Sequence, residues 1–243
     1  MTRTIVVSTV AIALLGSAAM LAQAQQPAPL NPELASFFVA DNPNGTGNLG
    51  GLAGADQMCQ SQAQAIGGRA ATRTWHAYLS AEQRGATPAV NARGRIGAGP
   101  WHNVKGVLIA AGVGALHGDQ PELRDRNNIQ RATALDAKGN EIPGVGSPPG
   151  MNQHDMLTGS DPDGRAYLDG YDHTCNNWTS DANVGPQPNP NVPPDRVRAM
   201  LGHSDRSGGN NTSWNSTHLS QGCGKQALIN TGGAGRFYCF ATN

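Results

Sequence analysis

Four widely spaced cysteines constrain the fold of this chain more than any other feature of its sequence. They stand at Cys59, Cys175, Cys223 and Cys239, and no two of them form the close Cys-x-x-Cys pair that a zinc site usually contains. An even number of cysteines in an oxidising compartment favours two disulfides, and four cysteines allow three pairings. The sequence therefore predicts a domain that two covalent cross-links stabilise.

The composition fits a loop-rich globular protein. Of the 243 residues, 32 are glycine and 16 are proline, so about one residue in five favours turns. Charged residues make up only 14% and the formal net charge is zero, which excludes a coiled coil and a highly charged disordered tail. Because the chain also lacks the basic excess that nucleic-acid-binding proteins use, we expect no nucleic-acid partner.

The first two dozen residues have the pattern of a secretory signal peptide. Arg3 supplies a positive charge, an apolar run follows from Ile5 to Leu15, and Ala22-Gln23-Ala24 forms a small-residue cleavage site. The apolar run is shorter than a membrane-spanning helix needs. We expect a signal peptide over 1–24, a Pro-rich flexible leader over 25–35, and export to the periplasm or the extracellular space without a membrane span.

The remaining residues, 36–243, predict one α+β domain in which loops outweigh regular elements. Phe37 to Ala40 predicts a first strand, and Leu52 to Ile66 predicts an amphipathic helix that carries Cys59 and ends at Gly67-Gly68. Further expected segments are a strand at 75–80, a helical turn at 91–96 and a buried apolar run at 107–111. The last third has almost no helix signal, and its Pro-rich run at 186–194 predicts an exposed loop within a long insertion, 181–212.

Several motifs in the C-terminal half resemble a known fold. They are Leu157-Thr158-Gly159-Ser160, Asp163-Gly164, Cys175-Asn176-Asn177-Trp178-Thr179-Ser180, Ser213-Trp214-Asn215-Ser216, Gln221-Gly222-Cys223 and Gly235-Arg236-Phe237-Tyr238-Cys239-Phe240. With the early strand, Gly-rich loop and cysteine-bearing helix, they resemble the C-type lectin-like fold, especially bacterial secreted domains related to the endostatin-like branch of collagens. The resemblance covers residues 36–242 and implies short antiparallel strands with one or two helices.

This resemblance also implies a cysteine pairing and two core residues. In that family the cysteine of the first helix pairs with that of the last strand, and the two middle cysteines pair together. Carried over, this gives Cys59–Cys239 and Cys175–Cys223. Trp178 and Trp214 match family positions that are core residues near the disulfide.

The resemblance further implies a ligand site in the long loop. Calcium-dependent sugar binding in this family uses an acidic-or-Gln, Pro, Asn tripeptide and a Trp-Asn-Asp motif. This chain has Gln187-Pro188-Asn189 and Trp214-Asn215-Ser216, and the neutral Ser216 in place of a carboxylate weakens calcium binding. The candidate ligand-binding residues are Gln187, Asn189, Asn210, Asn211 and Asn215.

Oxygen-bearing side chains supply the candidate Ca²⁺ ligands, because this hard cation prefers oxygen donors. They are Asp181, Asp205 and Asn215. The run Asp161-Pro162-Asp163-Gly164 begins like a calcium loop but lacks the later ligands of an EF-hand. We therefore interpret it as a turn rich in Asx residues.

The histidines define a different candidate site. His154-Asp155, Asp172-His173 and His203-Ser204-Asp205 lie in the loop-rich half, and histidine with carboxylate can bind zinc. Because there is no His-Glu-x-x-His and no i, i+4 histidine pair on a predicted helix, we interpret them as exposed or hydrogen-bonded loop histidines. Convergence of two or three of His154, His173, His203 and His218 would instead favour a metal site or an enzyme.

No residue is nominated as catalytic, since the sequence has neither a G-x-S-x-G elbow nor a Walker-type loop. The sequence favours an exported, disulfide-bonded binding module that recognises a surface glycan or a cell-surface protein through loops around 181–216. Two alternatives stay open. One is a secreted hydrolase or metal-binding protein that uses the His/Asp cluster, and the other is a structural cell-envelope protein without a small-ligand site.

Overall fold

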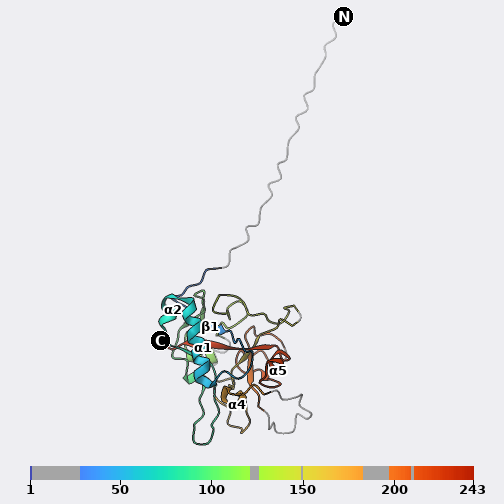
Figure 1. Cartoon of the computed structure of the whole chain (residues 1–243). Helices are drawn as coiled ribbons and strands as arrows, with labels where there is room; N and C mark the ends of the chain where they lie inside the picture. Colours follow the sequence, from blue (N-terminus) through green and yellow to red (C-terminus); the bar gives the residue numbers. More distant parts are fainter. Residues whose placement is uncertain (2–27, 121–125, 149, 183–196, 209–210) are drawn as a thin grey trace.

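The structure is a computed structural model that describes Met1 and residues 28–120, 126–148, 150–182, 197–208 and 211–243 (Figure 1). These residues form a mixed α/β domain of short elements. The helical segments are α1 (Gly51–Ile66), α2 (Gly68–Thr72), the 3₁₀ turn η1 (Ala92–Gly94), α3 (Val113–His117), α4 (Cys175–Trp178) and α5 (Lys225–Ile229). The strands are β1 (Phe37–Ala40), β2 (Trp75–Ala77), β3 (Trp101–His102), β4 (Leu108–Ala110), β5 (Asp155–Leu157), β6 (Met200–His203), β7 (His218–Leu219) and β8 (Gly233–Ala241).

The nine-residue strand β8 organises the main sheet, whose order is β1-β8-β5-β6-β7 with β2 also paired to β8. β1 lies along one edge of β8, while β5 and β2 follow one another along the other edge. All pairs are antiparallel except β5–β8, which is parallel. β3 and β4 form a separate two-stranded sheet. This order places β5, β6 and β7 side by side at one side of the sheet.

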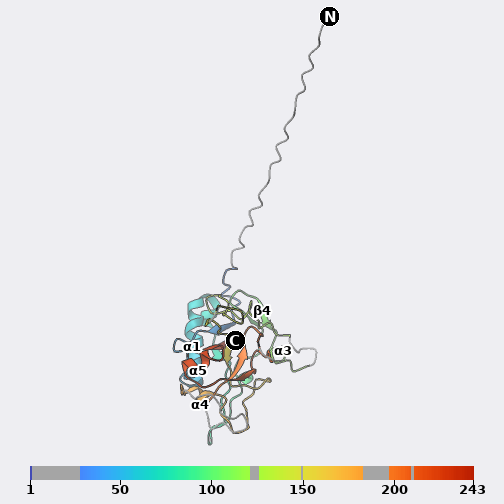
Figure 2. The same ribbon diagram turned by 90° about the vertical axis from the view of Figure 1, so that its right-hand side faces the viewer.

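Both faces of the sheet are buried, which explains the uninterrupted apolar runs in its strands. Along β8, Phe237 and Cys239 pack on the α1 side, while Tyr238 and Phe240 pack on the opposite side, as the two-residue repeat of a strand requires. Figure 2 shows α1 on one side of the sheet and β4 with α3 on the other.

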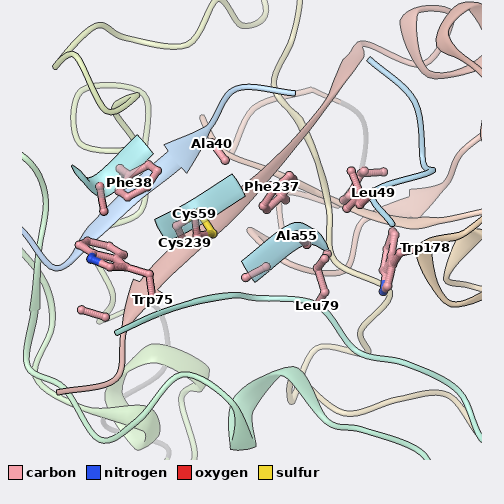
Figure 3. Packing of buried hydrophobic residues seen from close by; sticks show 14 of the residues in the cluster. Phe38, Ala40, Leu49, Ala55, Cys59, Trp75, Leu79, Trp178, Phe237 and Cys239 are labelled. Atoms are coloured by element: carbon pink, nitrogen blue, oxygen red, sulfur yellow. A yellow bond between two sulfur atoms is a disulfide. The ribbon is translucent and has the colours of Figure 1, made fainter. Parts of the chain in front are cut away.

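The core on the α1 side is centred on the disulfide Cys59–Cys239, which joins α1 to β8. Figure 3 shows this bond between Phe38 and Trp75 on one side and Leu49 and Trp178 on the other. The helix buries Ala55, Cys59, Ala63 and Ile66, which recur at three- and four-residue spacing. Apolar packing and a cross-link therefore hold the same helix against the same strand.

The second disulfide, Cys175–Cys223, fixes the loop-rich half. It starts at α4, whose four residues all have positive φ, from 49° at Cys175 to 66° at Trp178, so this element is a left-handed turn. Gly47 packs directly on the bond, since a Cβ there would lie 2.4 Å from Sγ of Cys175. These two disulfides are the pairs that the family resemblance implied.

Several local predictions agree with the structure. The first strand has the predicted bounds, the long helix begins one residue earlier than predicted, and a 3₁₀ turn lies within 91–96. Trp178 and Trp214 are buried, as expected of core residues. The run Asp161–Gly164 is a turn, which the backbone hydrogen bond from the N–H of Gly164 to the carbonyl of Asp161 closes, and Oδ1 of Asp161 also accepts from the backbone N–H of Arg165.

Other predictions differ from the structure. The run 107–111 is only partly buried, because Val107 and Leu108 are more than 40% exposed. α2 follows the first helix directly after Gly67, and α5 gives the last third a helix that the sequence did not signal. Of the predicted flexible leader, Ala35 is fully buried and Asn31 donates a backbone hydrogen bond to Val104. The predicted signal peptide, apart from Met1, lies outside the described residues.

Among the residues that the structure describes, no helix is both long and apolar enough to cross a membrane.

Candidate metal centre

Three adjacent strands bring together four side chains from distant parts of the chain: His154, Asp155, His203 and His218. Asp155 opens β5 and pairs directly with His203, the last residue of β6. His218 opens β7 and pairs with Leu201 of β6, one diagonal step from His203. His154 immediately precedes Asp155. Because directly paired residues place their Cβ atoms about 5 Å apart, the register of the sheet itself builds the cluster.

The ring nitrogens of the histidines surround one carboxylate oxygen. Oδ1 of Asp155 lies 3.3 Å from Nε2 of His154, 3.3 Å from Nε2 of His203 and 3.7 Å from Nε2 of His218. The Nε2 atoms of His203 and His218 are 3.1 Å apart. One donor atom each of His154, Asp155 and His203 lies within 4.8 Å of the others.

The carboxylate at the centre of this cluster is buried without a hydrogen bond. The Asp155 side chain has no exposed surface, and those of His154 and His203 are at most 5% exposed. Both oxygens of Asp155 lack a hydrogen-bond partner among the described residues, despite the short contacts to the rings. Because an unsatisfied buried charge is costly to the folded state, a cation at this point would compensate it.

The tautomers of two histidines strengthen this argument. Nδ1–H of His154 donates to Oδ1 of Asp205 at 2.8 Å, and Nδ1–H of His218 donates to the carbonyl oxygen of Leu219 at 3.2 Å. In the neutral imidazole the other nitrogen, Nε2, then carries a lone pair. The lone pair of His154 faces the carboxylate of Asp155 at 3.3 Å, so a proton or a metal ion between them would make this contact attractive. The lone pair of His218 lies 3.1 Å from Nε2 of His203, where it can accept a hydrogen bond or bind the same ion.

Four of the separations among the donor atoms are close to those of tetrahedral coordination. Zinc binds histidine nitrogen and carboxylate oxygen at about 2.0–2.1 Å, so two donors of a regular tetrahedron lie about 3.3 Å apart. The four separations measured among Asp155 Oδ1 and the Nε2 atoms are 3.3, 3.3, 3.7 and 3.1 Å. His154, Asp155 and His203 therefore have the donor types and the proximity of zinc ligands, and Nε2 of His218 lies close to two of these three residues.

Asp205 orients the ring of His154 through the hydrogen bond to Nδ1, the nitrogen opposite the one that faces Asp155. Its carboxylate is almost fully buried and also binds Arg131 at 3.2 Å, the N–H of Val145 at 3.1 Å and the N–H of Ser207 at 3.0 Å. Burial alone would raise the pKa of Asp205, but the hydrogen bonds from His154 and Ser207 outweigh it and hold that pKa well below its usual range. A carboxylate that orients a metal-binding histidine is a common second layer around protein metal ions.

The predicted calcium ligands do not form a site of their own. Asp205 belongs to the His154 contact just described, and Asp181 is exposed. Asn215 is 1% exposed, and its Nδ2 lies 3.0 Å from the hydroxyl of Tyr78 and 3.1 Å from the carbonyls of Asp161 and Pro162. Its amide is thus bonded within the protein.

The other predicted ligand-binding residues divide into two groups. Asn211 is exposed, and its Nδ2 donates to the carbonyl oxygens of Ser216 and Thr217. Gln187, Asn189 and Asn210 lie outside the described residues.

The interpretation of the histidines as exposed or hydrogen-bonded loop residues holds for His154, which lies just before β5 and bonds to Asp205, but it is wrong for His203, the last residue of β6. Both are buried within the cluster, and His203 belongs to a strand. Their rings stack at 4.2 Å between centroids. His173 does not join them, because its Nδ1 faces Glu82 and its ring stacks on Tyr167.

A scan of the sequence against protein-family models and a search of the curated proteins both find no match. The function is therefore inferred from the chemistry of the cluster.

Proposed function

We propose that this protein is an exported domain that binds one divalent transition-metal ion, zinc in the first instance, through His154, Asp155, His203 and His218. The observation that carries the proposal is the buried carboxylate of Asp155, which has no hydrogen bond within the described residues and faces three imidazole nitrogens. A bound cation would satisfy the carboxylate and the nitrogen lone pairs together.

The donor set favours zinc over calcium. Imidazole nitrogen suits zinc, copper, iron and nickel, whereas calcium takes six to eight oxygen donors. Within the cluster, Asp155 is the single residue with a carboxylate, and the other donors are nitrogen atoms. A mixed set of imidazole nitrogens and one carboxylate oxygen is a typical environment for zinc.

The ion would act as a third cross-link. It would tie β5, β6 and β7 together directly, whereas the two disulfides link α1 to β8 and α4 to Cys223. Two disulfides fit a protein that folds in an oxidising compartment. Membership of the C-type lectin-like fold is part of this proposal, and the cysteine pairing and the helix that bears Cys59 support it.

The proposal is tested by calorimetry on EDTA-treated protein. Titration with ZnCl₂ should give one site per chain, and zinc at a hundredfold excess over its Kd should stabilise the fold by about 2.7 kcal/mol. His203→Ala should abolish both effects, whereas His102→Ala, on the separate two-stranded sheet, should retain both. Zinc binding that His203→Ala leaves unchanged would refute the assignment.

A second candidate function is recognition of a surface glycan or protein by the long loop. A cavity of about 310 Å³ supports it, lined by Asn211, Ser213 and Trp214 of the loop together with Asn127 and Arg206. Amide, hydroxyl and guanidinium groups beside an aromatic ring suit a polar ligand such as a saccharide. Asn211→Ala should weaken binding on a glycan array, because Asn211 is the exposed amide of this cavity, and unchanged binding would exclude the site.

A further inference from the structure

We infer that His218 is a displaceable ligand, so that the fourth coordination position of the metal centre accepts an external monodentate donor, in particular a small anion. This inference rests on the proposed metal binding. It divides the cluster into a fixed part, His154, Asp155 and His203, and an exchangeable part, His218.

The first support is the difference in burial. The side chains of His154, Asp155 and His203 are 5%, 0% and 4% exposed, whereas that of His218 is 38% exposed. His218 thus forms the solvent-facing side of the cluster. Rotation of this side chain away from the ion would open a path to water, while the three other donors would stay covered by protein.

The second support is the difference in anchoring. His154 is held by Asp205, which has three further partners of its own. Asp155 and His203 pair with each other inside the sheet. His218 lies on a two-residue strand at the edge of the sheet. Its Nδ1 bonds to the carbonyl of the next residue, and its other polar contacts are those to His203 and Asp155 within the cluster itself. Short edge elements open at low cost in free energy.

The third support is that the three fixed side chains are enough to hold a metal ion without His218. Two histidines and one carboxylate hold a metal ion with an open position in many catalytic and oxygen-binding sites. A divalent ion with the single negative charge of Asp155 keeps a net charge of +1 in a buried place. Because a monoanion in the fourth position would neutralise that charge, whereas neutral His218 does not, the open centre should favour small anions.

Azide titrations of the Co²⁺-loaded protein test this inference, since the visible absorption of Co²⁺ reports its coordination. The wild-type protein should show a saturable change with azide. His218→Ala should still bind Co²⁺ and should bind azide at least about tenfold more tightly, because no internal ligand competes for the position. His218→Asn serves as a second variant that retains a polar side chain.

The outcomes separate this inference from the proposed function. If the wild-type protein does not bind Co²⁺, the proposed metal centre itself fails. If the wild-type protein binds Co²⁺ but azide changes neither its spectrum nor that of the variants, only the displaceable ligand is refuted. Loss of Co²⁺ binding in both His218 variants, to the extent seen in His203→Ala, would likewise show that His218 is a fixed ligand.

Discussion

Two polar clusters that contain histidine differ in how their hydrogen bonds are satisfied. In one, the hydroxyl of Tyr78 donates to Nε2 of His117 and accepts from Asn215, while Nδ1–H of His117 donates to Val113. In the other, Asp155 faces His154 and His203 without a hydrogen bond within the described residues. Each cluster has a fully buried polar side chain, Tyr78 in the first and Asp155 in the second, yet only the side chain of Tyr78 has its hydrogen bonds satisfied.

This difference distinguishes a structural network from a binding site. A network whose donors and acceptors are all matched stabilises one conformation. Burial also raises the pKa of Tyr78 far above its usual value, so its hydroxyl stays protonated and remains a donor. A buried carboxylate that no protein group satisfies destabilises the fold until something binds it. The predictions below test this distinction.

The largest effect is expected from Asn215→Ala. This change removes the donor shared by Tyr78, Asp161 and Pro162 and leaves buried acceptors unmatched, so the free energy of unfolding should fall by about 3 kcal/mol. Urea denaturation measures it, with Asn211→Ala as the exposed control expected to change stability by less than about 1 kcal/mol. Equal losses of unfolding free energy in the two variants would show that the buried hydrogen bonds of Asn215 stabilise the fold no more than those of the exposed Asn211.

Asp205→Asn should weaken zinc binding about 10- to 100-fold, because it alters the group that orients His154. Isothermal titration with ZnCl₂ gives the ratio of dissociation constants. Asp119→Asn, which removes an exposed partner of Arg93, is the matched control and should bind zinc like the wild type. An unchanged zinc Kd in Asp205→Asn would show that the orientation of His154 does not depend on Asp205.

Asp155→Asn should have opposite consequences without and with metal. In EDTA it should raise the free energy of unfolding by about 1 kcal/mol, because an amide replaces a buried charge that lacks a hydrogen bond. With zinc, the stabilisation seen in the wild type should be lost. A strong destabilisation in EDTA would instead indicate that Asp155 is the partner of a structural imidazolium.

The smallest effect concerns pH. Burial lowers the pKa of His117 below its ordinary value of 6.5. Below pH 6.5 the unfolded chain therefore protonates His117 more fully than the folded protein does. Stability should therefore fall as pH drops below 6.5. The charged groups that act on His117 are Arg93, Asp119 and Asp163.

His117→Gln isolates this contribution, because glutamine can accept from Tyr78 but does not titrate. Urea denaturation in EDTA at pH 7.5 and pH 5.5 should show a smaller loss for the variant than for the wild type. An equal loss would assign the acid sensitivity to other groups.

Local sequence patterns predicted the parts of the fold that local physics determines. The apolar run at 37–40 and the three- and four-residue spacing of apolar side chains at 52–66 suffice to specify β1 and α1. α4 escaped prediction because Cys175, Asn176, Asn177 and Trp178 adopt left-handed backbone conformations, which non-glycine residues rarely adopt without tertiary contacts. Its helix-like bonding depends on the disulfide and on the buried Trp178.

The candidate site could be found only in part from the sequence. The histidine–aspartate pairs are present in the sequence, but their convergence depends on the β5–β6 and β6–β7 registers, which local patterns do not specify. One signal was present but was not used: Asp155 directly precedes the apolar pair Met156-Leu157, and His203 follows Met200-Leu201 after Gly202, a pattern that places a polar group at the end of a short apolar segment. Sequence alone does not show which partners such a group meets there.

The most direct test of the metal centre is anomalous X-ray scattering at the zinc edge from crystals of the zinc-loaded protein. We predict one strong peak within about 2.0–2.1 Å of Nε2 of His154, Nε2 of His203 and an oxygen of Asp155. A peak at another position, or no peak between these three side chains at saturating zinc, would contradict the account.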